Sequence, residues 1–192
     1  MSANGKFDSL KARTPRKIEG DHFKPAAVLV PIQEREDGDY LVLTQRAENL
    51  YSHSGQVAFP GGGVEPEDAG PLDAALRESQ EEVGIDPRHV RIVGQLDQVT
   101  AGYNYLVTPV VGTIPSPYEF HLDLTETAAV FTVPIAALLD HNNVSLDERL
   151  SRYWGPIYHF WYEGWDIWGA TARITLQLLE VVYEFKGRPI PF

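Results

Sequence analysis

The sequence predicts an α/β fold, a sandwich in which helices pack against a mixed β-sheet. Three observations favour it. Short apolar runs bounded by Pro, Gly or Asp recur in both halves of the chain and are typical of strands. A helical segment follows three consecutive glycines, and apolar residues recur at helical spacing near the end of the chain. Strands and helices mixed along 192 residues indicate layers around one core.

The chain divides into an N-terminal arm and one domain. Residues 1–22 are polar and basic, and we expect them to form a loosely ordered, flexible tail. Residues 23–192 form the single domain, in which a turn at residues 37–39 joins the first two strands. The expected strands are residues 25–32, 40–44, 90–94, 106–111 and 130–133, followed by a hairpin of residues 158–163 and 165–168 around Gly164.

Three helices are expected in the domain. Residues 135–139 form a short helix, and residues 170–182 carry apolar side chains at helical spacing. The third helix begins near Pro71, which suits a first helical turn, and ends before Gly84, a residue typical of the position just past a helix. Its face toward the core is expected to consist of Leu72, Ala75, Leu76, Ser79 and Val83.

The third helix also carries an unusual group of carboxylates. Glu78 lies three residues before Glu81 and four before Glu82, so the three side chains should form one patch on the helix. Arg77 precedes Glu81 by four residues and can pair with it. Carboxylates gathered in this way repel one another unless a cation lies among them, and Mg²⁺ and similar hard cations prefer oxygen ligands. We therefore expect a divalent metal site.

A glycine turn precedes the carboxylate helix. Residues 61–63 are three consecutive glycines, and we expect them to form a tight turn leading toward the helix. Glycine lets the backbone approach a metal ion or a phosphate group closely, so Gly61 and Gly62 are candidate substrate-binding residues. The acidic helix could also be a solvated surface. The adjoining glycines and Arg77 favour a metal site that handles a pyrophosphate.

The residues Arg77 to Ile85, RESQEEVGI, resemble the R-E-U-x-E-E-x-G-U core of the Nudix box, where U is aliphatic. Ser79 departs from the pattern at its first aliphatic position. Upstream, Gly62 is followed after five residues by Asp68, and eight residues separate Asp68 from Arg77. This spacing, with Asp for Glu and one extra residue, resembles the coenzyme A pyrophosphatase subfamily of the Nudix hydrolases.

A second motif supports the likeness to that subfamily. The segment from Leu43 to Gly62, LTQRAENLYSHSGQVAFPGG, resembles the subfamily pattern L-L-T-x-R-(S/A)-x-x-L-R-x-H-x-G-Q-(V/I)-x-F-P-G-G. Tyr51 stands where the subfamily often has Arg, a potential phosphate contact. Residues 108–112 and 167–173 also resemble the subfamily, and the likeness covers roughly residues 25–182.

The resemblance implies a fold, a cofactor and a set of metal ligands. The fold would be an α/β/α sandwich with a mixed sheet and a catalytic loop-helix-loop. Mg²⁺ or Mn²⁺ would be held by Glu78, Glu81, Glu82 and the backbone carbonyl of Gly62. Arg77 would be part of the catalytic group.

The general base and the substrate contacts are less well defined. Glu81 or Glu82 could act through a metal-bound water. Glu126 is a further candidate, because it lies where the subfamily has a glutamate. Arg46 is a candidate phosphate ligand because its planar fork matches phosphate oxygens. His53 belongs to the same motif, where a substrate contact and a structural hydrogen bond are equal alternatives. Candidates for stacking on an adenine are Tyr103, Tyr105, Trp154, Trp161 and Trp165, although such aromatics are more often core or dimer contacts.

Composition narrows the class of protein. The net charge of -11 disfavours general nucleic-acid binding. No apolar run approaches the roughly 20 residues of a membrane span, and the N-terminus does not resemble a secretory signal. The absence of Cys excludes disulfides and thiol catalysis and fits a cytoplasmic protein. The resemblance implies a small nucleotide as the partner, with coenzyme A favoured, and a homodimer, since Nudix relatives are often dimers.

Three functions are compatible with the sequence. The first is metal-dependent hydrolysis of coenzyme A to 4′-phosphopantetheine and adenosine 3′,5′-bisphosphate, which both motifs favour. The second is Nudix pyrophosphatase activity on another substrate, such as ADP-ribose, a dinucleoside polyphosphate or a nucleoside triphosphate, which the departure at Tyr51 allows. The third is a non-catalytic nucleotide-binding regulator, against which the intact Arg77, Glu78, Glu81 and Glu82 argue.

Overall fold

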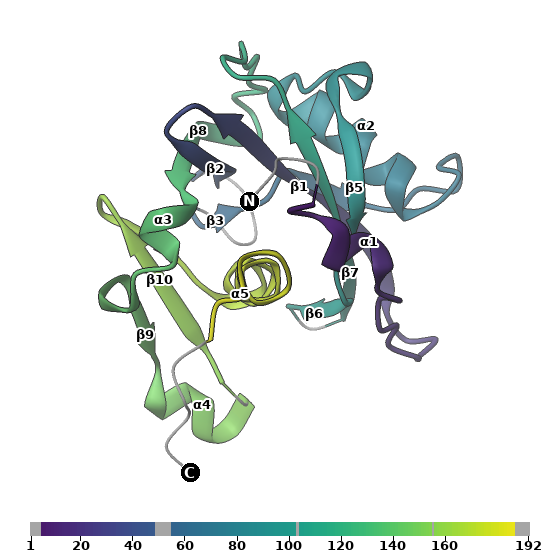
Figure 1. The fold of residues 1–192 in the computed structure, drawn as a ribbon. Coiled ribbons are helices and arrows are strands. Elements are labelled where there is room, and N and C mark those ends of the chain that lie inside the picture. The colour runs from purple at the N-terminus through teal and green to yellow at the C-terminus, as the bar shows by residue number, and fades with distance from the viewer. Residues whose placement is uncertain (1–4, 49–54, 103, 155, 187–192) are drawn as a thin grey trace.

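A large mixed β-sheet forms the centre of the molecule (Figure 1). The computed structural model describes residues 5–48, 55–102, 104–154 and 156–186. Strand β1 (Lys24–Arg35) runs parallel to β7 (Tyr105–Ile114) and antiparallel to β2 (Gly38–Arg46). The sheet order is β3-β2-β1-β7-β5, with β4 beside β1, β6 beside β7 and β8 beside β2. The other strands of this sheet are β3 (Val57–Ala58), β4 (Gly61–Gly63), β5 (Arg91–Gln95), β6 (Val99–Ala101) and β8 (Thr127–Pro134).

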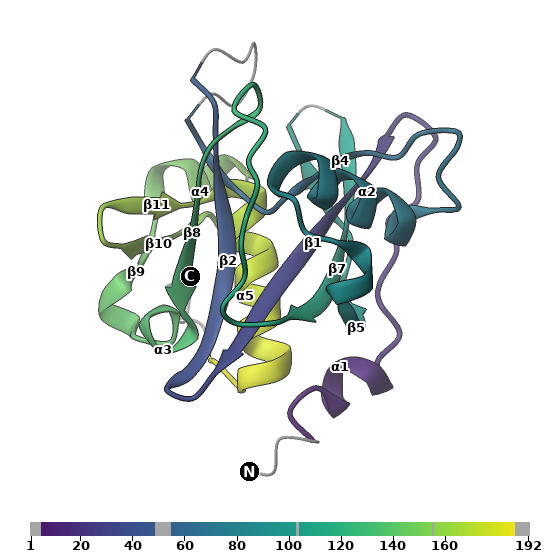
Figure 2. The same ribbon diagram turned by 90° about the horizontal axis from the view of Figure 1, so that it is seen from above.

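Two long helices cover opposite faces of this sheet (Figure 2). Successive side chains of a strand point to opposite faces. In β1, Leu29 therefore packs with helix α2 (Pro71–Val83), whereas Val30 packs with helix α5 (Gly169–Tyr183). Both faces of β1 are apolar because both are covered, as expected for strands buried within a layered fold. The predicted α/β sandwich with a mixed sheet is confirmed.

A smaller sheet and several short elements complete the fold. Strands β9 (Val144–Leu146), β10 (Tyr158–Tyr162) and β11 (Trp165–Ile167) form an antiparallel sheet, and β10 and β11 are the expected hairpin. The chain turns at Glu163 and Gly164, which both have positive φ. The short helices are α1 (Asp8–Ala12), η1 (Pro87–His89), α3 (Ile135–Leu138), η2 (His141–Asn143) and α4 (Glu148–Trp154).

The described part of the N-terminal arm packs on the domain, in contrast to the loosely ordered tail expected from its polarity. Phe7 and Leu10 are buried in the core on the α5 side of the sheet. Ion pairs also join the arm to the domain: Lys6 pairs with Glu34 and Asp39, and Arg13 pairs with Asp97. The polar composition of residues 1–22 did not predict these contacts, because the apolar side chains that pack on the domain, Phe7 and Leu10, lie within a mainly basic segment.

Other elements match the sequence analysis or extend it. The expected strand at residues 130–133 is the second half of β8, and the helices at residues 71–83, 135–139 and 170–182 are present as α2, α3 and α5. Across the described residues, no helix combines the length and the apolar run needed to cross a lipid bilayer.

Candidate active site

Residues 61–63 form strand β4, not the tight turn expected from three consecutive glycines. Gly61 pairs with Val28 and Gly62 with Ala27 in an antiparallel ladder with β1. The φ of Gly61 is 152°, and a Cβ there would overlap the backbone of β1. A Cβ on Gly62 would overlap the carboxylate of Glu78. Gly61 and Gly62 are thus required, because strand β1 approaches the first closely and the side chain of Glu78 approaches the second.

Helix α2 carries the carboxylates to β4. The helix ends at Gly84, whose left-handed conformation (φ 73°) lets its N–H donate to the carbonyl of Gln80. Its buried residues are Ala74, Ala75, Ser79, Glu82 and Val83. Leu72, expected in the core, is 39% exposed, because it lies in the first turn at the edge of the buried face. The charged Glu82, which was not expected on the face of α2 toward the core, is buried there.

Glu82 is the most deeply buried of the three glutamates, with 5% of its surface exposed. Its Oε2 accepts a hydrogen bond of 3.1 Å from the backbone N–H of Gly61, and its Oε1 lies 3.6 Å from Nη1 of Arg46. Burial raises the pKa of Glu82 to about 7, because these two contacts offset the loss of hydration only in part. The charges of Glu78 and Glu126 raise this pKa further.

Glu78 and Glu81 occupy different environments. Burial raises the pKa of Glu78, although its Oε1 lies 2.9 Å from Nη1 of Arg77. The carboxylate of Glu78 lies against Gly62, as the contact with a built Cβ shows. The side chain of Glu81 is 61% exposed and pairs with Arg77 at 3.1 Å. The three carboxylates therefore do not share one environment, as a single patch would. Glu78 and Glu82 are the inner carboxylates, and Glu81 is the outer one.

Arg77 joins the helix to the loop that precedes it. Its Nε and Nη2 donate to the two carboxylate oxygens of Asp68, each at 3.0 Å, and Nη2 also donates to the carbonyl of Gly63. The hydrogen bonds with Asp68 raise the pKa of Arg77 and lower that of Asp68. Asp68 therefore holds the guanidinium of Arg77 in place. Through its bonds to Glu78 and Glu81, Arg77 fixes the helix carboxylates beside β4.

Glu126 is an exposed residue just before β8. Its backbone carbonyl accepts a hydrogen bond of 2.8 Å from the N–H of Ala47, which ties this loop to the end of β2. Its negative charge contributes to the raised pKa of both Glu78 and Glu82, so Glu126 belongs to the surroundings of the inner carboxylates. The candidate His53 lies outside the described residues.

The donor chemistry of this group suits a divalent cation. Among the described residues, no three His, Asp or Glu side chains come together as a metal-binding cluster. Glu78, which is partly buried, and the buried Glu82 nevertheless place two carboxylates over the consecutive glycines Gly62 and Gly61. Burial raises the pKa of each, and repulsion from neighbouring carboxylates adds to this effect. A hard cation such as Mg²⁺ or Mn²⁺ would relieve this repulsion and prefers oxygen donors, so the residues fit it.

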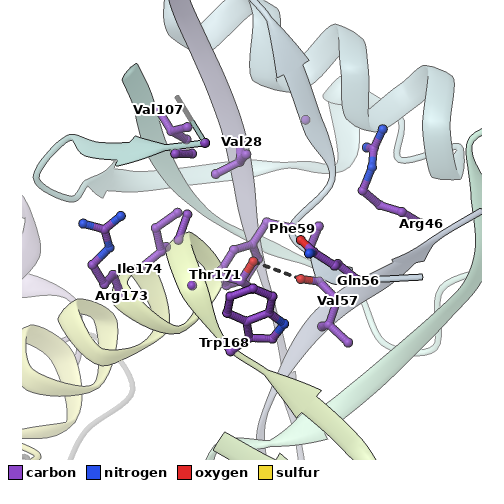
Figure 3. A pocket seen from close by; sticks show the side chains of 16 residues that line it. Val28, Arg46, Gln56, Val57, Phe59, Val107, Trp168, Thr171, Arg173 and Ile174 are labelled. Atoms are coloured by element: carbon purple, nitrogen blue, oxygen red, sulfur yellow. Dashed lines mark hydrogen bonds between the residues drawn. The ribbon is translucent and has the colours of Figure 1, made fainter. Parts of the chain in front are cut away.

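Gly61 and Arg46 also line a cavity of about 410 Å³ (Figure 3). The walls of the cavity are mostly apolar. Arg46 lies between the cavity and the carboxylates, because its side chain lines the cavity and also approaches Glu82. The volume lies within the range of about 300–1,000 Å³ typical of small-molecule sites. The lining residues come from β1, β2, β3, β4, β6, β7 and the start of α5, or from positions next to them: Val28, Arg46, Gln56, Val57, Ala58, Phe59, Gly61, Ala101, Gly102, Val107, Trp168, Gly169, Ala170, Thr171, Arg173 and Ile174.

The aromatic side chains that line this cavity are Phe59 and Trp168, and neither is among the stacking candidates taken from the sequence. Trp168 is 37% exposed, and its ring stacks on His159 at a centroid distance of 6.0 Å. His159 is held in turn by Asp166, whose Oδ1 lies 2.8 Å from its Nδ1. Thr171 donates a hydrogen bond of 3.0 Å to the carbonyl of Val57, so the start of α5 is fixed to β3.

The aromatic residues proposed from the sequence lie elsewhere where they are described. Trp165 stacks on Phe131 at 4.2 Å, and Trp161 donates a hydrogen bond to Ser145. Tyr105 is exposed on β7 near Lys24. Tyr103 and the side chain of Trp154 are outside the described residues. A sequence signal for Trp168 existed, because it lies within the second stretch that resembles the subfamily, residues 167–173.

Comparison with protein families and curated proteins gives consistent matches. Residues 23–153 match the family model described as the NUDIX domain. An uncharacterized Nudix hydrolase named NudL from Photorhabdus laumondii is 39% identical over 176 residues, which cover 90% of this chain and 92% of the relative. An uncharacterized Nudix hydrolase of the same name from Enterobacter sp. is 42% identical over 174 residues, which cover 90% of this chain and 89% of the relative.

Solved structures share the fold at low sequence identity. A Nudix hydrolase from M. smegmatis, RenU, superposes with a TM-score of 0.57 at 17% identity, over 91% of this chain and 92% of that one. The Ap4A hydrolase of C. elegans, in a binary complex, gives a TM-score of 0.50 at 21% identity, over 60% of this chain and 83% of that one. At such identities the likeness concerns the fold alone.

Proposed function

The chain belongs to the Nudix family, and from this premise we propose that it hydrolyses the pyrophosphate bond of coenzyme A or its derivatives. The products are 4′-phosphopantetheine and adenosine 3′,5′-bisphosphate. Nudix hydrolases generally use divalent metal ions, and the proposed cofactor here is Mg²⁺ or Mn²⁺. The proposed site residues are Arg46, His53, Gly61, Gly62, Arg77, Glu78, Glu81, Glu82 and Glu126.

One observation carries the proposal. The carboxylates of Glu78 and Glu82 lie against two consecutive glycines, and the first of these, Gly61, lines the same cavity as Arg46. A pyrophosphate at Gly61 would thus meet the carboxylate group on one side and a mainly apolar cavity on the other. This arrangement separates the reacting bond from the part of the substrate that is recognised.

The residues divide the chemical work. Glu78 and Glu82 would hold the cation, with Glu81 and the carbonyl of Gly62 as the further ligands that the resemblance implies. When bound, the cation neutralises charge developing on the phosphate oxygens and lowers the pKa of a water molecule. Arg46 would donate hydrogen bonds to a phosphate oxygen. Arg77 keeps Glu78 and Glu81 in position through its bonds to Asp68.

For proton transfer, Glu82 or Glu81 would act through a water molecule that the cation activates when bound. Glu126 is the second candidate, because its charge acts on both inner carboxylates. The choice of coenzyme A as substrate is supported by the two sequence motifs described above.

A substrate panel tests the proposal. The purified protein is incubated with Mg²⁺ or Mn²⁺ and coenzyme A, an acyl-coenzyme A, ADP-ribose, NADH, a diadenosine polyphosphate and nucleoside triphosphates, and kcat/KM is compared. We expect the highest value for coenzyme A, with equal amounts of the two products and no reaction in excess EDTA. Faster cleavage of another substrate would replace coenzyme A, as the departure at Tyr51 allows. Nucleotide binding without turnover would identify a regulator instead.

A further inference from the structure

Arg173 lies on α5 at the cavity, on the opposite side from Arg46 in Figure 3. Its Nη2 donates a hydrogen bond to the carbonyl of Thr100. Among the described residues, no carboxylate forms an ion pair with Arg173. A guanidinium carries five N–H donors in a fixed fork. The bond to Thr100 therefore leaves most of its hydrogen-bonding capacity available at the cavity.

In the part of the chain that the structure describes, Arg173 lacks an acidic partner although acidic residues are in excess in this chain, and Arg16 and Arg35 are also without one. The sequence contains 27 acidic and 16 basic residues and carries a net charge of -11. Arg13, Arg77, Arg88 and Arg91 each pair with at least one carboxylate. Arg173 itself is exposed, so an anionic group that enters the cavity from solvent can reach its guanidinium. A cation kept without a counterion beside a cavity is suited to an anionic group of a ligand.

The space between the two arginines suits a flat apolar group. Figure 3 shows Phe59, Thr171 and Trp168 between Arg46 and Arg173. The indole of Trp168 is held in place by its stack on His159, and the hydroxyl of Thr171 is already bonded to the backbone of β3. The cavity thus offers an aromatic surface and few free polar groups along its middle.

We propose that Arg173 binds a second phosphate of the substrate, the 3′-phosphate of the adenosine in coenzyme A, while the adenine lies in the cavity beside Trp168. In coenzyme A a single ribose carries the 5′-pyrophosphate, the 3′-phosphate and the adenine. The pyrophosphate would lie at Arg46 and the inner carboxylates and the 3′-phosphate at Arg173, while the adenine, branching from the same ribose, would lie against the apolar wall beside Trp168. The inference rests on the proposed function and adds a residue that selects coenzyme A over its 3′-dephospho form.

A ratio of two substrates separates this role from a structural one. We would measure kcat/KM for coenzyme A and for 3′-dephospho-coenzyme A with the wild type and with Arg173→Gln. Charge-assisted hydrogen bonds contribute about 1.5–3 kcal/mol, so the preference for coenzyme A should fall roughly tenfold to a hundredfold in the variant. Damage to the bond with Thr100 alone would lower both values together and leave the ratio unchanged, which would overturn the proposal.

A binding measurement keeps the inference distinct from the proposed function. In the presence of EDTA, the affinities for adenosine 3′,5′-bisphosphate and adenosine 5′-monophosphate are measured by calorimetry for the same two proteins. The wild type should prefer the bisphosphate and Arg173→Gln should not. The control variant Arg88→Gln changes an exposed arginine away from the cavity and should keep the preference.

The outcomes separate cleanly. Absence of turnover on both coenzymes would refute the proposed function, and a bisphosphate preference that depends on Arg173 would still support the inference. Turnover of coenzyme A with equal binding of the two nucleotides by the wild type would refute the inference and leave the proposed function standing.

Discussion

The backbone N–H of Gly61 donates a hydrogen bond of 3.1 Å to Oε2 of Glu82. This bond joins strand β4 to helix α2 at the point where the apolar cavity begins. It fixes one oxygen of a buried carboxylate, while Arg46 lies 3.6 Å from the other. A charged group of this kind costs free energy to bury, and the two contacts offset only part of that cost. Such costs are typical of functional sites.

Gly62→Ala should remove activity without unfolding the protein. The added Cβ would overlap the carboxylate of Glu78 and displace it, whereas no positive φ constrains Gly62. A displacement of about 1 Å in a catalytic group can lower the rate roughly a hundredfold, which is the expected loss in kcat. The matched control is Gly63→Ala, since a Cβ there meets nothing within 4 Å. Equal kcat values for the two variants would contradict the placement of Glu78.

Arg46→Ala should chiefly raise KM for a phosphorylated substrate. Arg46 lines the cavity and approaches Glu82, so its expected role is a hydrogen bond to a phosphate oxygen. Loss of one charge-assisted bond should raise KM about tenfold or more. Steady-state kinetics with coenzyme A would test this, with Arg88→Gln as the control. An unchanged KM would remove Arg46 from the substrate site.

The stability of the metal-free protein should fall as pH rises from about 5 to 8. The pKa of Glu82 is raised from 4.5 to about 7 in the folded state, so the folded protein binds more protons than the unfolded chain between these values. Stability from this group is complete below pH 4.5 and is lost as pH rises through 7. The size of the effect is up to about 3 kcal/mol, and the raised pKa of Glu78 adds in the same direction.

Urea denaturation in EDTA at several pH values would measure this loss. Glu82→Gln cannot ionise at this position, so its stability should depend less on pH than that of the wild type. Parallel curves for the two proteins would show that Glu82 does not titrate in this range and would contradict the burial argument.

The sequence predicted which residues of α2 bring carboxylates together better than it predicted how deeply each one is buried. Helical spacing located Glu78, Glu81 and Glu82 correctly on α2, because that pattern depends only on local geometry. It could not show that Glu82 would be buried and Glu81 exposed, since this depends on where β4 lies. Three glycines suggested a turn, yet pairing with β1 makes them a strand. Close packing and a turn both require glycine, and the sequence alone does not separate them.

The sequence also did not predict the cavity, because its walls depend on contacts between residues that are distant in the chain. Its walls combine β3 and β4 with the start of α5, more than a hundred residues apart in the chain, as in the bond between Thr171 and Val57 with a sequence separation of 114. The aromatic candidates were chosen by residue type, and packing placed Trp168 at the cavity and Trp165 against Phe131. The docking of Phe7 and Leu10 was missed for a similar reason.

The most direct test of the site compares the wild type with Glu82→Gln in coenzyme A hydrolysis over a range of Mg²⁺ concentrations. Circular dichroism and the melting temperature establish that the variant is folded, and the exposed Glu119→Gln serves as the matched control. The account predicts saturable metal dependence for the wild type and the control, and a loss of at least roughly a thousandfold in kcat for Glu82→Gln. Turnover by the folded Glu82→Gln variant at close to the wild-type rate would contradict it.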